Sequence, residues 1–310
     1  MTTRLRRQWE QNRTVKPVQA PAAPLNALTI DVEDYYHVSA FERCVSRDQW
    51  ESLPSRVVPN THRLLDHLAE AGVQATFFVL GWVAERQPSL VRAIRAAGHE
   101  IGCHSYWHRL IYEQTPEQFR TDLRQACRVL ENILGEKITL YRAPSFSITR
   151  QSLWALDLLA EEGIRVDSSI YPTHHDRYGI AGTPLHPHRM VVNGGPLLEY
   201  PPPVWPLMGY PLPIGGGGYF RLYPYALTRY GLQAINASGR PFAVYLHPWE
   251  FDPRQPRLRP GLSRSFRHYV GLHRTEKRLQ RLLHDFRFGT LTQSLNTTYE
   301  FAPLSRPLAA

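Results

Sequence analysis

Two hydrophobic periods alternate along the chain. Apolar residues spaced three and four positions apart predict amphipathic helices, and the short apolar runs that follow them predict buried strands. The helical segments are residues 62–72, 88–98, 115–135 and 149–163. Each ends on a glycine suited to a C-cap with positive φ: Gly72, Gly98, Gly135 and Gly163. Thr115 and Gln118 predict a capping box, and Thr149 predicts another N-cap.

The apolar runs predict seven strands. They are residues 27–32, 75–80, 100–105, 139–144, 164–169, 197–202 and 242–248. Strands that alternate with helices indicate a parallel sheet covered by helices. No Gly-x-Gly-x-x-Gly motif follows a strand, which argues against a dinucleotide-binding fold. We therefore expect an α/β barrel or near-barrel, in which chemistry gathers at the carboxyl ends of the strands.

Most of these strands end in a polar side chain that could serve chemistry. In chain order these are Asp31, His104 with His108, Arg142, Asp167 and His247. They are scattered in sequence, but a barrel would bring them together. This convergence is the main reason to expect an active site.

The sequence His-Ser-Tyr-Trp-His places His104 and His108 four residues apart. On a helix such a pair lies on one face, where both imidazoles could hold one metal ion. Two histidines with a carboxylate form a hydrolytic zinc arrangement. The acids Asp31, Glu33 and Asp34 could supply that carboxylate and a second one that accepts a proton.

His247 could protonate a leaving group, and Arg142 could hold the proton-accepting carboxylate in its ionised form. The structural alternatives are a core histidine at position 247 and a buried ion pair at Arg142. The joint pattern of these residues favours the catalytic interpretation.

Composition adds limits on partners and location. The 310 residues are 43% hydrophobic with a mean hydropathy of −0.37 and a formal charge of +9. No apolar run approaches the ~20 residues of a membrane span. Residues 1–25 contain no apolar stretch, so we expect a disordered lead and a cytoplasmic protein. Three cysteines without CxxC spacing predict neither disulfides nor a thiolate zinc site.

Many of the basic residues lie in one part of the chain, residues 254–287. They could form a docking surface, but we favour a solvated helix face. No nucleic-acid-binding motif accompanies them, so we expect no nucleic-acid partner.

Five motifs, TIDVED, HSYWH, RAPSFS, VDSS and YLHPWE, resemble in order and spacing the polysaccharide deacetylases of the NodB-homology type, carbohydrate esterase family 4. The resemblance implies a distorted (β/α)7 barrel over residues 26–250 and a C-terminal helical and loop extension over 251–310, packed on the barrel. It also implies metal-dependent removal of N-acetyl groups from N-acetylhexosamine residues of a polysaccharide or its lipid-linked precursor. Further stretches, such as DVEDYYHVSAFE and GGGGYFRLYPY, resemble the branch found at exosortase-type exopolysaccharide loci.

The resemblance also implies a role for each matching residue. Asp31 would be the general base, oriented by Arg142, and His247 the general acid, oriented and tuned by Asp167. His104 and His108 would bind one divalent metal ion, Zn²⁺ with Co²⁺ or Ni²⁺ as alternatives. The backbone N–H near Ser145 would stabilise the oxyanion.

Two motifs depart from the family pattern. The family commonly has adjacent aspartates in the first motif, whereas the acids here are separated. The third ligand is therefore ambiguous, and Asp34 is preferred over Glu33. Ser145 stands where the family usually has an aromatic residue that lines the sugar site, with Phe146 beside it.

The second half of the chain contains two loops whose function is open. Gly217 and Tyr219, in the glycine-rich stretch, would approach the sugar, or the glycines merely form a flexible connection. The histidines of residues 173–189 could bind another metal, but a loop-surface position is favoured.

The expected partner is an N-acetylated glycan. No membrane-spanning segment is expected, although peripheral contact with membrane-bound polysaccharide machinery would fit. Two alternatives remain: an inactive carbohydrate-binding or assembly barrel, and an amidohydrolase that acts on a small amide. Retention of Asp31, His104, His108, Arg142 and His247 favours the enzyme over the inactive barrel.

Overall fold

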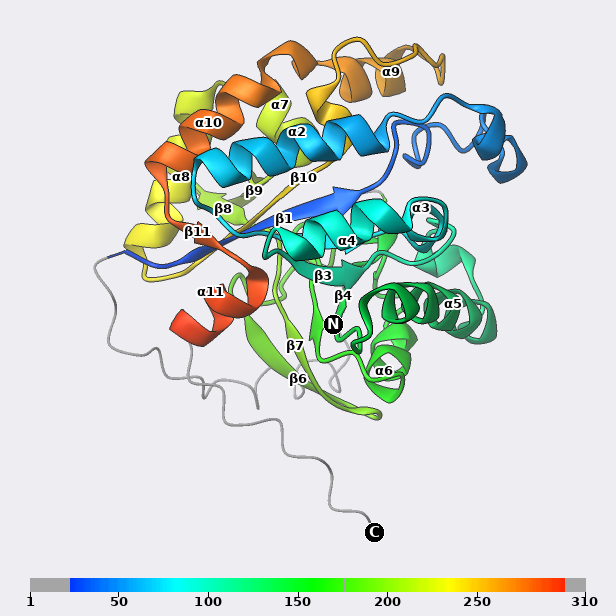
Figure 1. Cartoon of the computed structure of the whole chain (residues 1–310). Coiled ribbons are helices and arrows are strands. Elements are labelled where there is room, and N and C mark those ends of the chain that lie inside the picture. Colours follow the sequence, from blue (N-terminus) through cyan, green and yellow to red (C-terminus); the bar gives the residue numbers. More distant parts are fainter. Residues whose placement is uncertain (1–22, 176, 299–310) are drawn as a thin grey trace.

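The computed structural model describes residues 23–175 and 177–298 (Figure 1). The strands are β1 (Asn26–Val32), β2 (Thr76–Val79), β3 (Glu100–Cys103), β4 (Leu140–Tyr141), β5 (Val166–Asp167), β6 (His188–Val192), β7 (Gly195–Glu199), β8 (Val204–Leu207), β9 (Tyr210–Pro213), β10 (Ala243–Leu246) and β11 (Phe288–Gly289). The α-helices are α2 (Val57–Glu70), α3 (Gly81–Arg86), α4 (Pro88–Ala96), α5 (Pro116–Leu134), α6 (Trp154–Glu161), α7 (Gly217–Leu222), α8 (Tyr225–Ala237), α9 (Leu262–Tyr269), α10 (Thr275–Asp285) and α11 (Leu291–Thr298). The 3-10 helices are η1 (Arg47–Ser52), η2 (Ile111–Glu113), η3 (Pro144–Phe146), η4 (Pro248–Phe251) and η5 (Leu272–Arg274). Most of the expected N-terminal lead, residues 1–22, lies outside the described residues.

A mostly parallel sheet forms the centre of the molecule, in the order β10-β1-β2-β3-β4-β5-β7-β6. Every neighbouring pair from β10 to β7 is parallel, whereas β6 pairs with β7 in the antiparallel direction. The seven predicted strands are these parallel ones, so the predicted α/β class is confirmed. Within the described residues no ladder joins β10 to β6, and the hydrogen-bonded sheet ends at these two strands.

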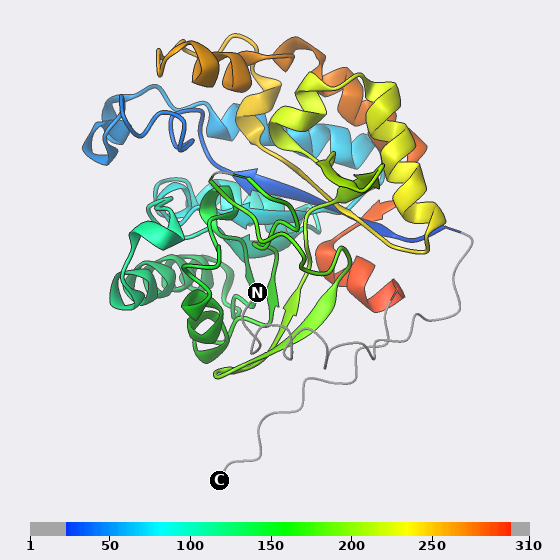
Figure 2. The same cartoon turned by 180° about the vertical axis from the view of Figure 1, so that it is seen from behind.

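Helices surround the sheet, as the alternating pattern predicts (Figures 1 and 2). The capping box of Thr115 and Gln118 at the start of α5 is present, and the four predicted C-cap glycines all have positive φ. The expected N-cap at Thr149 is wrong. The Thr149 backbone N–H donates to Ser152 Oγ (2.9 Å) in a local turn, and α6 begins only at Trp154.

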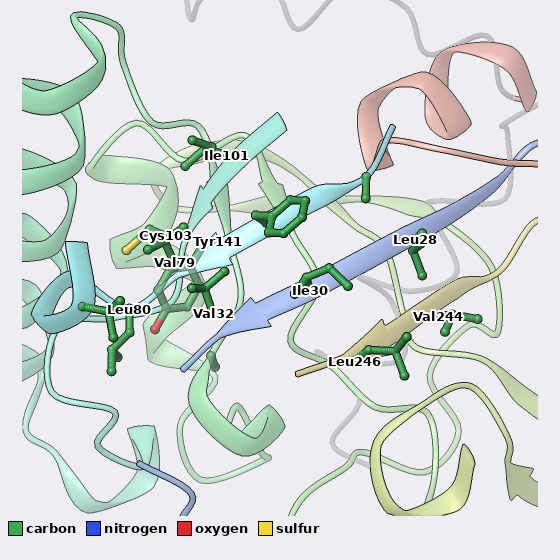
Figure 3. Close-up of a cluster of buried hydrophobic side chains, with 14 of the residues drawn as sticks. Leu28, Ile30, Val32, Val79, Leu80, Ile101, Cys103, Tyr141, Val244 and Leu246 are labelled. Atoms are coloured by element: carbon green, nitrogen blue, oxygen red, sulfur yellow. The ribbon is translucent and has the colours of Figure 1, made fainter. Parts of the chain in front are cut away.

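The core around β1 explains how the sheet presents polar groups. Leu28, Ile30 and Val32 are fully buried on one face of β1, next to Val244 and Leu246 of β10 (Figure 3). Because side chains alternate along a strand, the residues between them point to the other face. Thr29 and Asp31 are those residues, and both contact a buried arginine described below.

The segment after η4 returns to the sheet. Strand β11 pairs in parallel with β1, and Ser294 of α11 shares a hydrogen bond with Tyr200 (Oγ to Oη, 2.8 Å). Across residues 23–175 and 177–298, no helix has the length and apolar character needed to cross a membrane.

Candidate metal and catalytic site

A cavity of about 390 Å³ lies at the carboxyl ends of the parallel strands. Most of the predicted site residues line it: Asp31, Glu33, His104, His108, Ser145, Phe146, Gly217, Tyr219 and His247. Asp34, Arg142 and Asp167 are not among the lining residues. The strand ends therefore bring together side chains that are separated by more than 200 positions in the sequence.

A carboxylate and two imidazoles meet in this cavity. One ligand atom from each of Glu33, His104 and His108 lies within 4.8 Å of the others, and all three side chains are buried. Glu33 Oε2 lies 2.7 Å from His108 Nε2, and Glu33 Oε1 accepts a hydrogen bond from Trp249 Nε1 (3.1 Å). This donor set is one that holds a divalent cation.

Protonation and hydrogen bonding also suit these residues to a metal. Nδ1 of His104 donates to the carbonyl oxygen of Arg142 (2.8 Å), which leaves Nε2 with its lone pair. Burial lowers the pKa of His104 to about 4, so the imidazole is neutral at physiological pH. Burial alone would raise the pKa of Glu33, but His108, His247 and His104 outweigh it and hold the pKa far below its usual value. The site therefore combines a neutral imidazole with an ionised carboxylate, as metal binding requires.

The two histidines converge through a turn and not through a helix, which corrects the expected geometry. Residues 104–110 are irregular, and Ser105 and His108 have positive φ values of 62° and 51°. The carboxylate of Asp122 on α5 fixes the turn by accepting from the backbone N–H groups of Tyr106 (2.7 Å) and Trp107 (3.0 Å). The imidazole centroids consequently lie 5.3 Å apart.

The structure contradicts the placement of Asp34 beside the histidine pair. Asp34 Oδ2 accepts hydrogen bonds from Ser55 Oγ (2.8 Å) and from the backbone N–H groups of Arg56 (2.7 Å) and Val57 (3.0 Å). These groups form the N-terminus of α2, so Asp34 caps that helix from a distance. Glu33, the alternative, is the acid that reaches the histidines.

Asp31 is held by Arg142, and the predicted contact between them is present. Arg142 Nη1 donates to Asp31 Oδ1 (2.8 Å) and to Thr29 Oγ1 (2.7 Å). Arg142 is completely buried, and its other donors reach the carbonyl oxygen (3.1 Å) and the hydroxyl (2.8 Å) of Ser168. Since one carboxylate oxygen of Asp31 is fixed by this network, Oδ2 remains for chemistry in the cavity, 3.8 Å from His247 Nε2.

The residue that faces the other nitrogen of His247 is Glu250, which the sequence analysis missed. Glu250 Oε2 lies 3.2 Å from His247 Nδ1 and accepts from the His247 backbone N–H (3.0 Å). Glu250 Oε1 pairs with Arg221 Nε (2.7 Å), and both side chains are buried. Burial opposes a charged imidazole, but Glu250, Glu33 and Asp31 outweigh it and raise the pKa of His247 to about 9. The spacing His-Pro-x-Glu, which closes a capping box on η4, was the signal for this contact.

The expectation that Asp167 orients His247 is therefore wrong. Asp167 on β5 lies opposite Glu199 on β7 in the sheet register, and the two carboxyls hydrogen-bond to each other. Burial raises the pKa of Asp167 to about 6 and that of Glu199 well above its usual value. A proton held between these carboxyls lets both remain buried. Their role is to tie two strands together next to the Arg142 network.

The loops after β3 and β4 have strained backbone conformations next to the cavity. Of the five non-glycine residues with positive φ in the described chain, four lie in the two loops at this site: Ser105, His108, Ser145 and Phe146. Such strain is frequent where a backbone group must be aimed at a ligand. Ser145 also shares a hydrogen bond with Ser39 (Oγ to Oγ, 2.8 Å), which ties this loop to the segment after β1.

Aromatic rings form one wall of the cavity. Phe146 contacts Tyr245 with ring centroids 4.8 Å apart, and the hydroxyls of Tyr178 and Tyr219 lie 2.7 Å apart. The wall is rich in rings of the kind on which sugar faces stack. Phe146, next to the variant position Ser145, thus supplies an aromatic surface in the cavity.

The glycine-rich stretch before α7 packs too closely for side chains. A Cβ on Gly216 would overlap the carbonyl oxygen of Tyr245, and a Cβ on Gly215 would overlap the ring of Pro203. Gly217 has a φ of 51°. Gly216 and Gly217 pack closely against Tyr245 of β10, and Gly215 packs against Pro203, so these glycines form more than a flexible connection.

Gly216→Ala is expected to destabilise the fold by about 1–3 kcal/mol, because the methyl group must displace the backbone of β10. Gly218→Ala is the matched control, since the nearest atom to its Cβ is 3.9 Å away. The control should change stability by less than about 0.5 kcal/mol. Urea unfolding measures both, and equal stabilities of the two variants would contradict the packing account.

Two family models match consecutive parts of the chain. Residues 48–164 match "Polysaccharide deacetylase", and residues 168–296 match "Domain of unknown function (DUF3473)". The first segment contains His104, His108 and Arg142, and the second contains His247 and Glu250.

Curated relatives match part of the chain. It is 28% identical over 120 residues to the peptidoglycan-N-acetylglucosamine deacetylase of Bacillus cereus, covering 35% of this chain and 44% of the relative. It is 31% identical over 101 residues to the chitooligosaccharide deacetylase of a Bradyrhizobium species, covering 32% of this chain and 43% of the relative. The matches thus span less than half of these relatives.

Solved structures share the fold over nearly the whole chain. A Mycobacterium smegmatis protein, provisionally assigned as a polysaccharide deacetylase, matches with a TM-score of 0.57 and 24% identity, covering 96% of this chain and all of that one. The Puue allantoinase matches with a TM-score of 0.58 and 16% identity, covering 88% of this chain and 89% of that one. At these identities the likeness shows the fold alone. The sequence comparisons thus relate residues 48–164 to the polysaccharide deacetylase family model and part of the chain to curated deacetylases.

Proposed function

We propose that this chain is a metal-dependent hydrolase that removes N-acetyl groups from N-acetylhexosamine residues of a polysaccharide or its lipid-linked precursor. The observation that carries the proposal is the meeting of two separate sets of residues in one cavity. Glu33, His104 and His108 form a metal-binding set, and Asp31 and His247 form an acid–base pair beside it. Hydrolysis of an amide by a metal-activated water uses both.

Glu33, His104 and His108 are the residues that would hold the metal ion. A carboxylate with two imidazoles suits Zn²⁺, with Co²⁺ or Ni²⁺ as alternatives. When bound, the ion supplies Lewis acidity toward the acetyl carbonyl group and toward water. A hydrogen bond from Trp249 orients Glu33, and a hydrogen bond to the Arg142 carbonyl oxygen orients His104.

Asp31 acts as the general base in this proposal. Arg142 keeps Oδ1 in a hydrogen bond, while Oδ2 accepts a proton from the attacking water. The oxygen of that water forms a bond to the acetyl carbon. The backbone N–H near Ser145 stabilises the negative charge that develops on the carbonyl oxygen.

His247 acts as the general acid. Glu250 faces Nδ1, so Nε2 carries its proton toward the cavity and delivers it to the nitrogen of the sugar. The carbon–nitrogen bond then breaks, and acetate and a free amino sugar result. Arg221 positions Glu250 and acts through it.

Exopolysaccharide biosynthesis in the cytoplasm is the setting that we propose. The sequence stretches that resemble the exosortase-type branch support a role in exopolysaccharide biosynthesis. The three cysteines remain free thiols, which suits a reducing compartment. Fractionation of cells that produce the full-length protein tests this location.

Acetate release across a panel of acetylated glycans tests the activity. Oligomers of N-acetylglucosamine, peptidoglycan fragments and a simple amide such as acetamide are compared with Zn²⁺ present. The proposal expects acetate and free amine in equal amounts from at least one glycan. Release from acetamide alone would identify a small-amide hydrolase, and binding without release would identify an inactive carbohydrate-binding barrel.

Glu250→Gln is expected to shift the alkaline limb of the pH profile of kcat/KM to lower pH. Loss of this negative charge lowers the pKa of His247 from about 9, and activity disappears as pH rises through the pKa of a general acid. The exposed Glu117→Gln serves as the control and should leave the profile unchanged. An unmoved alkaline limb in Glu250→Gln would show that His247 is not the acid.

A further inference from the structure

One surface beside the cavity combines positive charge with exposed hydrocarbon. Residues 253–275 contain six arginines and neither aspartate nor glutamate. Arg254, Arg257 and Arg259 are exposed in the segment before α9, and Arg267 is exposed on the helix itself. This region therefore presents a strongly positive patch to solvent.

Helix α9 adds apolar side chains to that patch. Leu262 is 93% exposed and Phe266 is 59% exposed, and their spacing of four residues places them on one helical face. The opposite side of α9 is anchored, since His268 is buried and stacks on Trp249 with ring centroids 4.2 Å apart. The exposed face is thus held rigidly, with no partner in the described chain.

The patch surrounds the entrance of the catalytic cavity. Arg264, Phe266 and Arg267 line the same cavity as Asp31, and so does Leu222, which is 48% exposed. Because Asp31 is buried, whereas Leu222, Phe266 and Arg267 are exposed and Arg264 is half-buried, these residues form the outer rim. Figure 1 shows α9 on the upper edge of the molecule, above the end to which the arrow of β1 points.

We propose that α9 and residues 254–261 form a docking surface for an anionic lipid bilayer. Arginines attract the negative surface of such a bilayer, and Leu262 and Phe266 enter the boundary between headgroups and acyl chains. Hydrocarbon on Leu262 would gain little from a hydrated polyanionic glycan, so the combination favours lipid. Docking would place the cavity entrance at the membrane, where a lipid-linked acetylated sugar is presented; this last step rests on the proposed function.

The chain also has an exposed apolar patch without positive charge, and this patch serves as the matched control. Met208 lies in the turn between β8 and β9, and Tyr210 begins β9; they are 91% and 79% exposed. Residues 200–214 contain no arginine or lysine. An apolar patch that lacks positive charge should not select anionic membranes.

Co-sedimentation with vesicles tests the docking surface. The full-length protein is mixed with vesicles of phosphatidylcholine alone or with one third phosphatidylglycerol. Binding to the anionic vesicles should be at least about fivefold stronger and should weaken at high salt. The double variant Arg259→Glu and Leu262→Glu should lose this preference, whereas Met208→Ser with Tyr210→Ser should keep it. Neither altered residue of the first variant lines the cavity.

Three outcomes would overturn the proposal. They are equal sedimentation with both vesicle types, unchanged binding by the double variant, and binding to a soluble anionic polysaccharide in place of vesicles. Acetate release from a soluble oligomer by the same double variant keeps the two proposals apart. In the wild type, acetate release without vesicle binding would refute the docking surface alone, and vesicle binding without acetate release would refute the deacetylase alone.

Discussion

Replacing Glu33 with glutamine is expected to weaken divalent-cation binding by more than about 100-fold. This is a larger loss than that caused by removing a residue that only orients a metal ligand. Glutamine keeps the size of the side chain and can still accept the Trp249 hydrogen bond, but it removes the negative charge. Without that charge, two imidazoles alone hold the ion. Isothermal titration with Zn²⁺ measures the affinity, and acetate release should fall with it.

Asp34→Asn is the control for this prediction. Asp34 lies next to Glu33 in sequence, yet its carboxylate caps α2. The variant should keep the wild-type affinity for Zn²⁺ and lose less than about 1 kcal/mol of stability, because an asparagine oxygen can still accept from the N-terminus of the helix. If Asp34→Asn loses the metal ion and Glu33→Gln keeps it, Asp34 is the third ligand and Glu33 is not.

Asp31→Asn is expected to lower kcat by about 10²–10⁴-fold, which is the usual contribution of a general base. The asparagine oxygen can still accept from Arg142, so the local structure is maintained. Metal affinity should change little, because Asp31 is not one of the three side chains proposed to hold the ion. The rate of acetate release under saturating substrate and Zn²⁺ measures the effect.

Asp66→Asn provides the matched comparison, since Asp66 is an exposed acid on α2. It should retain the wild-type rate. A fall of less than tenfold in Asp31→Asn would assign the base to another group.

The sheet could be predicted because hydrophobic periodicity reports burial directly. All seven predicted strands are present in one parallel array, and the glycines that end the helices have the predicted backbone conformation. The pattern could not reveal β6, β8 and β9, which lie in a stretch with many prolines, glycines and polar residues. These strands pair as local hairpins, β6 with β7 and β8 with β9, but the prolines and glycines interrupt the alternating pattern that would predict them.

The site was predicted less completely, for reasons that differ from residue to residue. Glu33 and Asp34 are adjacent, and only the path of the chain after β1 decides which of them faces the histidines. Asp167 was assigned to His247 through the family resemblance, but the sheet register places Glu199 beside it. Glu250 lies three residues after His247, and the distant, buried Arg221 that holds it could not be predicted from that spacing.

Interactions over long sequence distances decide the chemistry at this site. Arg142 and Asp31 are 111 positions apart, and Trp249 and Glu33 are 216 positions apart. A local motif can suggest such residues but cannot state which atoms meet. The parallel sheet supplies that information by aligning the strand ends.

The most direct test of the central claim is acetate release by chelator-treated protein during a titration with Zn²⁺, using an N-acetylglucosamine oligomer as substrate. Activity should be absent after chelation and should return in full at one equivalent of metal ion. The double variant His104→Ala and His108→Ala should stay inactive throughout the titration while keeping the wild-type circular dichroism spectrum. Full activity in the chelated protein, or wild-type activity in the folded double variant, would contradict the assignment of a metal-dependent deacetylase site.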